Sequence, residues 1–296
     1  MTEQNPVSGQ GYVPAFLDLV DVVARLRAPD GCPWDREQTH ESVARNITEE
    51  AAETVDAIEA GDLDGLKEEL GDLLLQVLLQ SQIAVEAGEF DLKDVMNGIA
   101  AKLVRRHPHV FGIEAALDAM ELTPEKRKVF EQKAQGVDSP EEVLDLWDSI
   151  KLLEREQIED RPGLLDSVPR ALPALMQAQD ISRKAISAGF DWTGSDAVWH
   201  QFDLELDEFR AEVRGSRRAA EEFGDVLFTL VNVGIKEGID AESALRGTVN
   251  RFRQRWALME GYASGEGGEI SDYPVEKQEA FWQRAKDEIA RTSGGV

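Results

Sequence analysis

The residues best suited to chemistry are two sets of carboxylates, each made of two pairs with members three residues apart. The sets are Glu50, Glu53, Glu69 and Asp72, and then Glu205, Glu208, Glu222 and Asp225. On a helix, residues three apart lie on one side, with roughly 5–6 Å between their Cβ atoms. Two such helices side by side bring four carboxylates together, and a divalent cation would relieve their repulsion. The pattern predicts that these eight acids are metal ligands.

One such pair would carry little weight in a chain with 58 acidic residues, because solvated helix faces are rich in Glu and Asp. The spacings between successive acids, 3-16-3 and 3-14-3, repeat in order and favour metal binding over a solvated face. All-oxygen ligands suit Mg²⁺, Mn²⁺ or Ca²⁺ rather than zinc or copper. A di-iron bundle would need Glu-x-x-His on two helices, and only Glu37-x-x-His40 has that spacing.

A cluster of cations follows each acidic set. The clusters are Lys102, Arg105 and Arg106, and then Arg251 and Arg255. Their spacing puts two cations on one helical face, where they can bind an anion, and the alternative is ion pairing with neighbouring acids. Cations after metal-binding acids, in both halves, favour a polyphosphate between them.

Further motifs recur in the same order, which indicates an internal duplication. The matched segments are Gly31-Cys-Pro-Trp34 with Gly189-Phe-Asp-Trp192, Glu69-Leu-Gly-Asp72 with Glu222-Phe-Gly-Asp225, and Trp147-x-x-x-Lys151 with Trp282-x-x-x-Lys286. We therefore expect two similar helical units, at 1–160 and 161–296. A tryptophan one turn before a lysine is either a core residue or a platform for a nucleobase.

The elements that must position these residues are helical throughout, because the apolar residues follow a helical period and no stretch alternates as a strand would. We expect helices at about 12–27, 38–60, 63–87, 91–106, 123–134, 141–159, 170–188, 196–213, 217–237, 240–262 and 274–291. The fold class expected is all-α, with each unit a small bundle.

Composition excludes several classes of protein. The net charge of −26 argues against nucleic-acid binding, which needs a basic face, although a small nucleotide needs only a few cations. No segment has the pattern of a signal peptide or of a membrane span. The single cysteine, Cys32, fits a reducing compartment. A cytoplasmic protein is expected.

At these residues the chain resembles the MazG family of nucleoside triphosphate pyrophosphohydrolases, in its tandem-domain form. The resemblance runs from Gly31-Cys-Pro-Trp-Asp35 through Glu49-Glu50-x-x-Glu53, Glu69-Leu-Gly-Asp72 and Arg105-Arg106-His-Pro-His-Val-Phe111 to Gly189-Phe-Asp-Trp192 and Glu222-Phe-Gly-Asp225. It implies two four-helix-bundle-like domains, a homodimer, and Mg²⁺-dependent hydrolysis of NTPs and dNTPs to the monophosphate and pyrophosphate. The resemblance assigns the eight acids to metal, the five cations to phosphates, and Trp282 to the base.

The chemistry expected is attack of a metal-activated water on the α-phosphorus, with Mg²⁺ as the cofactor and Mn²⁺ as an alternative. Glu53 and Glu208 are candidate general bases as well as ligands. The two copies differ, since Leu204 stands where the first has Glu49, and Gln254 where the first has Arg105. Both sites are kept, with a slight preference for the second, which the resemblance credits with turnover. The rival function is a helical nucleotide-sensing or regulatory protein without turnover.

Overall fold

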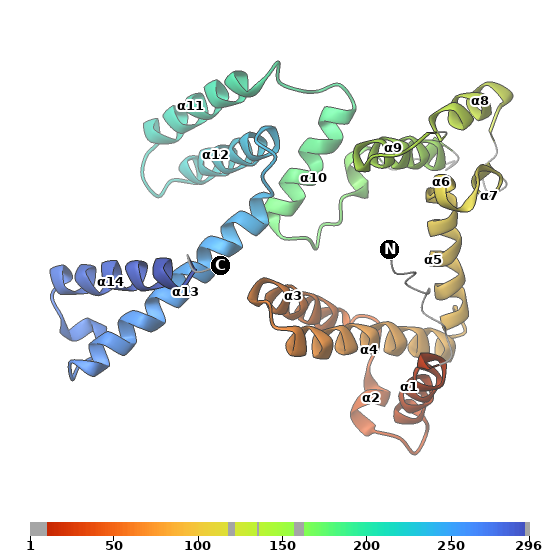
Figure 1. The fold of residues 1–296 in the computed structure, drawn as a ribbon, viewed down its shortest axis with the longest axis horizontal. Helices are drawn as coiled ribbons and strands as arrows, with labels where there is room; N and C mark the ends of the chain where they lie inside the picture. The colour runs from red at the N-terminus through yellow and green to blue at the C-terminus, as the bar shows by residue number, and fades with distance from the viewer. Residues whose placement is uncertain (1–10, 118–121, 135, 157–162, 294–296) are drawn as a thin grey trace. The chain divides into compact units, whose positions relative to one another are not determined.

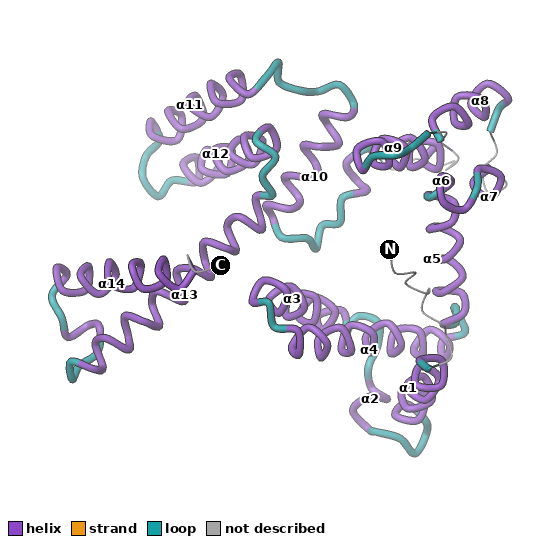
Figure 2. Tube along the Cα trace, viewed as in Figure 1, coloured by secondary structure: helices purple, strands orange, loops and turns teal. Residues whose placement is uncertain are grey.

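In the part of the chain that the structure describes, the protein consists of helices and connecting loops (Figures 1 and 2). The structure is a computed structural model that describes residues 11–117, 122–134, 136–156 and 163–293. The predicted all-α class is confirmed. None of the described helices is both long and apolar enough to cross a bilayer. The chain divides into two compact units, Met1–Arg161 and Pro162–Val296.

The first unit contains α1 to α9. Their bounds are α1 Tyr12–Arg27, α2 Pro33–Glu37, α3 Ala44–Ala60, α4 Leu63–Ala87, α5 Leu92–Arg106, α6 Pro108–Phe111, α7 Ile113–Leu117, α8 Pro124–Lys133 and α9 Pro140–Glu156. The second unit contains two short 3₁₀ helices and α10 to α14. Their bounds are η1 Leu165–Ser167, α10 Ala174–Ser187, α11 Ser195–Ala211, α12 Arg217–Lys236, α13 Ala241–Gly265, η2 Ile270–Asp272 and α14 Val275–Ser293.

Each unit has a long helical hairpin, α3 with α4 and α11 with α12 (Figure 1). Gly61 ends α3 in a left-handed conformation, with φ of 67°, and Asp62 caps α4 by accepting backbone N–H groups at 3.0 and 3.2 Å. The second hairpin uses Gly215, with φ of 76°, and Ser216 as the cap of α12. Both hairpins thus stop and restart the chain within a few residues, which places the two acid-bearing helices side by side.

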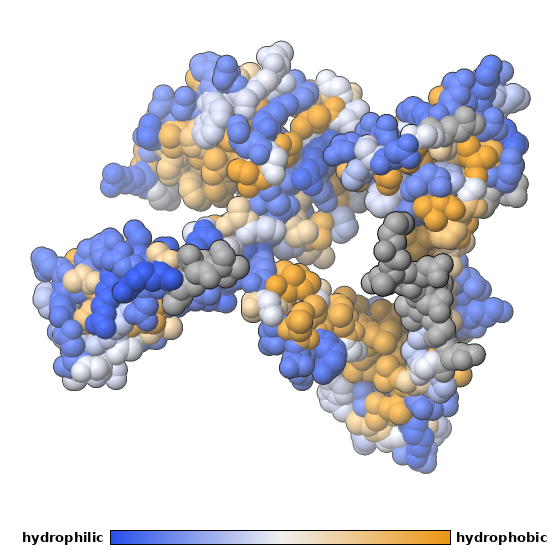
Figure 3. All heavy atoms as spheres, viewed as in Figure 1, coloured by the Kyte–Doolittle hydropathy of each residue, from blue (hydrophilic) through white to orange (hydrophobic). Residues whose placement is uncertain are grey.

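The buried cores lie away from much of the hairpin surface. In the first unit one core joins α1 to the C-terminal half of α4, and another joins α7, α8 and α9. In the second unit a core joins α13 to α14 around Met259 and Phe281. Apolar side chains remain exposed on the hairpins, among them Leu70 and Leu74 on α4 and Phe223 and Leu227 on α12. Apolar residues gather on the visible hairpin surfaces in Figure 3.

The sequence placed the long helices well and missed the short ones. The bounds of α1 and α4 agree with those predicted, whereas α3 begins at Ala44 rather than at residue 38. Residues 38–43 form a turn in which the Ser42 hydroxyl donates to Gln38 and to the Thr39 carbonyl, so local side-chain bonds compete with the helix. The short helices α2 and α6 start at Pro33 and Pro108, because proline fits the first helical position.

Candidate metal centres

Three acids of the second set meet on the α11–α12 hairpin. Glu205 comes from α11, and Glu222 and Asp225 come from successive turns of α12. One carboxylate oxygen of each lies within 4.8 Å of the others. Glu222 is only 4% exposed, Glu205 is half-buried and Asp225 is exposed. The hairpin therefore presents three oxygens that converge from a buried base toward solvent.

The first unit builds the same triad on α3 and α4. Glu50, Glu69 and Asp72 are all half-buried, and their nearest carboxylate oxygens also lie within 4.8 Å of one another. The prediction that matching helical edges bring the acids together holds for these three, as it does for their counterparts in the second unit. The all-oxygen donor sets fit a hard divalent cation such as Mg²⁺.

The triads are electrostatically unfavourable by themselves. The pKa of Glu50 is raised above its ordinary value, mainly by burial and to a lesser extent by the charges of Asp72, Glu53 and Glu69. Burial also raises the pKa of Glu222, and the charges of Glu208, Asp225 and Glu205 add to this, while Arg218 works against it. A divalent cation would stabilise the ionised carboxylates that the fold otherwise disfavours.

Glu53 and Glu208 stand beside the triads rather than within them. Neither belongs to the three-oxygen groups, but the charge of Glu53 acts on Glu50 and Glu69, and that of Glu208 acts on Glu222. Their roles as ligand or general base therefore stay predictions.

Arg218 is a residue near the second triad that the sequence analysis missed. Its Nη2 lies 2.9 Å from Glu222 Oε1, and its Nε lies 3.5 Å from Glu212 Oε1. The guanidinium, four residues before Glu222 on α12, partly neutralises the buried acid. Its i,i+4 spacing from a predicted ligand was the signal in the sequence that would have identified it.

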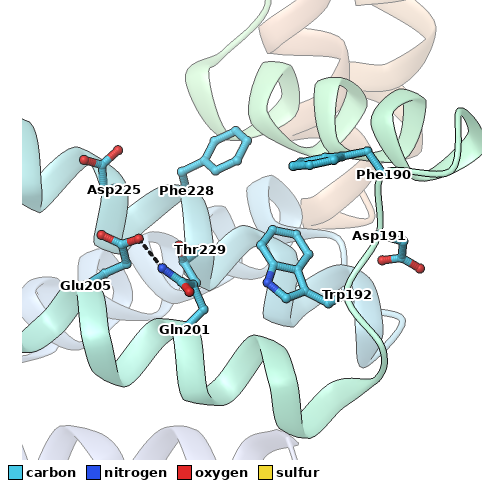
Figure 4. Close-up of a pocket in the computed structure, with 8 residues that line it drawn as sticks. All are labelled: Phe190, Asp191, Trp192, Gln201, Glu205, Asp225, Phe228 and Thr229. Carbon is cyan, nitrogen blue, oxygen red and sulfur yellow. Dashed lines mark hydrogen bonds between the residues drawn. The ribbon is translucent and has the colours of Figure 1, made fainter.

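A cavity of ≈ 440 Å³ opens beside the second triad, between the hairpin and the loop that precedes α11 (Figure 4). Its lining residues are Phe190, Asp191, Trp192, Gln201, Glu205, Asp225, Phe228 and Thr229. Figure 4 shows the rings of Phe190, Trp192 and Phe228 at one end and the carboxylates of Glu205 and Asp225 at the other. The cavity thus joins an aromatic end to an anionic end formed by two carboxylates of the triad.

Two contacts hold the walls of this cavity. Lys236 of α12 donates to both oxygens of Asp191, at 2.7 and 2.8 Å, and this pairing lowers the pKa of Asp191. The Gln201 amide donates to Glu205 Oε1 at 2.7 Å and so fixes a triad member. Trp192, in the loop that precedes α11, lines the cavity.

The predicted phosphate-binding cations have different surroundings in the two units. Glu154 of α9 pairs with Arg105 and Arg106 at 2.5 and 2.7 Å, so ion pairing, the alternative considered for these clusters, is what the first unit shows, while Lys102 is exposed. In the second unit Arg251 donates to Thr248 Oγ1 at 2.8 Å, and the Arg255 guanidinium lies 5.3 Å from the Trp282 ring centroid. Both clusters lie on helices that lead away from the hairpin of their own unit (Figure 1).

The repeated Trp-x-x-x-Lys tryptophans pack beside these cations rather than against the triads. Trp147 makes an edge contact with His107, with ring centroids 4.9 Å apart. Trp282 packs on Phe252 at 5.1 Å and belongs to the apolar surroundings of the α13–α14 core. A contact between Trp282 and a base stays a prediction.

The similarity to known proteins extends over almost the whole chain. Residues 38–111 match the MazG nucleotide pyrophosphohydrolase domain, a segment that contains the first triad and the first cation cluster. The nucleoside triphosphate pyrophosphohydrolase/pyrophosphatase MazG of Thermotoga maritima is 36% identical over 271 residues, which cover 92% of this chain and 95% of the relative. The nucleoside triphosphate pyrophosphohydrolase of Escherichia coli K12 is 38% identical over 273 residues, with 90% and 95% covered.

The YabN protein of Bacillus subtilis is 39% identical over 280 residues, which cover 94% of this chain but 53% of that protein. The similarity to the Thermotoga and Escherichia relatives spans both units and both acidic hairpins, and it accompanies an all-α fold with a carboxylate triad in each unit. The chain belongs to the MazG family of nucleoside triphosphate pyrophosphohydrolases, which are hydrolases of phosphoric anhydride bonds.

Proposed function

We propose that this protein hydrolyses nucleoside triphosphates to the monophosphate and pyrophosphate, with Mg²⁺, at the carboxylate triads of the hairpins. The observation that carries the proposal is the convergence of three carboxylates beside a cavity with an aromatic end, in a chain whose relatives are named pyrophosphohydrolases. Tandem MazG-like domains at 1–160 and 161–296 are part of the proposal, since each unit contains one triad.

The residues of the second unit have different proposed roles, according to their positions around the triad. Glu205, Glu222 and Asp225 would hold Mg²⁺, which when bound neutralises phosphate charge and lowers the pKa of an attached water. Glu208, beside the triad, would take the proton as water oxygen attacks the α-phosphorus and the bond to the β-phosphate breaks. Gln201 orients Glu205 through its 2.7 Å hydrogen bond.

The aromatic end of the cavity suits the nucleobase. Phe190, Trp192 and Phe228 offer ring faces on which any base can stack, while the triad takes the triphosphate. The corresponding residues of the first unit are Cys32, Trp34 and Leu75, of which only Trp34 is aromatic, and it is 59% exposed. We therefore assign base recognition chiefly to the second unit.

We also propose that the protein is a homodimer. Phe223, Leu227 and Leu230 follow one another along α12 at helical spacing and are 40–49% exposed, and a stripe from Leu245 to Trp256 continues on α13. A second copy would cover these apolar faces. It would also bring the cations of its α13 toward the triad, which α13 of the same chain leads away from (Figure 1).

Product analysis with a matched pair of variants tests the function. Glu222→Gln removes a triad carboxylate and should lower Mg²⁺-dependent pyrophosphate release from mixed dNTPs by about 10²–10³-fold. Glu221→Gln, one residue earlier and paired with the exposed Arg217, should retain activity. Release of the diphosphate and phosphate instead would refute attack at the α-phosphorus. Nucleotide binding without any turnover would favour a sensor.

A further inference from the structure

In the first unit, one carboxylate holds two arginines of the cation cluster. Glu154 accepts from Arg105 Nε at 2.5 Å and from Arg106 Nη2 at 2.7 Å. The three side chains are 20–30% exposed, so water screens the contact only partly. Charge-assisted bonds of this kind are about twice as strong as neutral ones.

A packed helix presents Glu154, so the contact is pre-organised. Leu146 and Ile150 of α9 are almost fully buried against Phe130 of α8 and residues of α7. Trp147 of the same helix touches His107, directly after the arginines. Little side-chain or backbone entropy is therefore lost when Glu154 meets them.

The carboxylate is ionised at neutral pH. Burial by itself would raise the pKa of Glu154, but hydrogen bonds from Arg106 and Arg105, together with their charges, bring the pKa below its ordinary value. A full negative charge thus occupies the place where the guanidinium groups would meet a phosphate oxygen, since carboxylate and phosphate match the same donor geometry.

The second unit lacks this carboxylate. Glu154 stands seven residues after Trp147, and the residue seven after Trp282 is Ile289. Within the described ranges, Arg251 and Arg255 form no ion pair with a carboxylate; one donates to Thr248 and the other lies over Trp282. The two units therefore differ in whether their arginines are already neutralised.

We propose that Glu154 is a built-in competitor of the substrate, occupying the phosphate-binding arginines of the first unit so that a triphosphate must displace it. This inference rests on the proposed function, because it takes these arginines as phosphate contacts. The second unit, with isoleucine at the matching position, is open to a triphosphate. Charge-assisted bonds of this strength would weaken binding to the first unit by about ten- to a hundredfold.

The number of nucleotide sites per chain tests the proposal. The probe is the Mg²⁺ complex of α,β-methylene-ATP, whose α–β linkage resists hydrolysis, titrated into the full-length protein in a calorimeter. The parent should bind one probe per chain in the micromolar range and a second one about ten- to a hundredfold more weakly, whereas Glu154→Gln should bind two in the micromolar range. Glu141→Gln makes the same change on an exposed residue of α9 and should still bind one in that range. A single micromolar site in a folded Glu154→Gln protein, or two micromolar sites in the parent, would overturn the inference.

Modification of the parent with phenylglyoxal gives a second measurement that needs no variant. At a probe concentration that fills only the tighter site, peptide mass mapping should show that the probe protects Arg251 and Arg255 and leaves the modification of Arg105 and Arg106 unchanged. Protection of Arg105 or Arg106 at that same concentration would contradict the proposal even if Glu154→Gln fails to fold. Pyrophosphate release by the parent is scored separately, so a gain of sites without turnover would refute the pyrophosphohydrolase and leave the role of Glu154 standing.

Discussion

At the scale of residues, each hairpin holds carboxylates that would repel one another in the absence of a cation. Glu222 illustrates this, since it is almost fully buried and Arg218 only partly offsets its burial and the neighbouring acids. The sequence identified the triad acids from spacing and repetition. It could not separate Glu205 from Glu208, because both lie on the same side of α11 and only the packing of α12 brings Glu205 into the triad.

The contrast between the two tryptophans that precede the hairpins makes a prediction at this scale. Trp192→Ala removes a ring face from the cavity and should raise the KM for dNTPs about 5–100-fold with little change in kcat, because stacking a base contributes roughly 1–3 kcal/mol. Trp34→Ala is the matched control, and loss of its exposed ring should change the KM little. Steady-state pyrophosphate release gives both constants. Equal effects of the two substitutions would contradict the assignment of base recognition to the second unit.

At the scale of elements, the buried side chain of Arg27 links several segments of the first unit. Arg27 ends α1 with a side chain that is 5% exposed, and it pairs with Glu86 of α4 at 2.7 Å. The same guanidinium donates to the carbonyls of Asp35 and Gln38, which lie on either side of the end of α2. One side chain therefore joins α1, α4 and the connection that leads to the acidic helix α3.

Arg27→Ala should lower the free energy of unfolding of the first unit by about 2–4 kcal/mol, because it leaves two partly buried carbonyls and a partly buried carboxylate without their partner. Arg25→Ala, two residues earlier, removes an exposed pair with Asp30 and should cost less than about 1 kcal/mol. Urea denaturation followed by circular dichroism measures both. Similar losses in the two variants would show that Arg27 is no more than a surface contact.

At the scale of the whole molecule, the exposed apolar stripes of α12 and α13 favour association with a second copy. Leu230→Glu places a charge in the stripe of α12 and should raise the dissociation constant of the proposed dimer at least tenfold, since a buried unpaired carboxylate is costly. Ser264→Glu adds the same charge to an exposed polar position of α13 and should leave the dimer intact. Sedimentation velocity reports the oligomeric state. A parent protein that is monomeric at micromolar concentration would refute the dimer.

The sequence by itself determined the helical class, the order of the long helices, the repeated motifs and the two sets of four acids from which the triads are drawn. Helical period and acid spacing are local properties, and each can be read without knowing what packs against what. Only the tertiary structure decided that Glu154 meets Arg105 and Arg106, that Trp192 lines a cavity, and that Trp282 packs beside Arg255. These contacts join residues far apart in the chain, and they depend on which helices pack against one another. Helices of similar amphipathic character can pack in several ways, and hydrophobic period and acid spacing do not specify which.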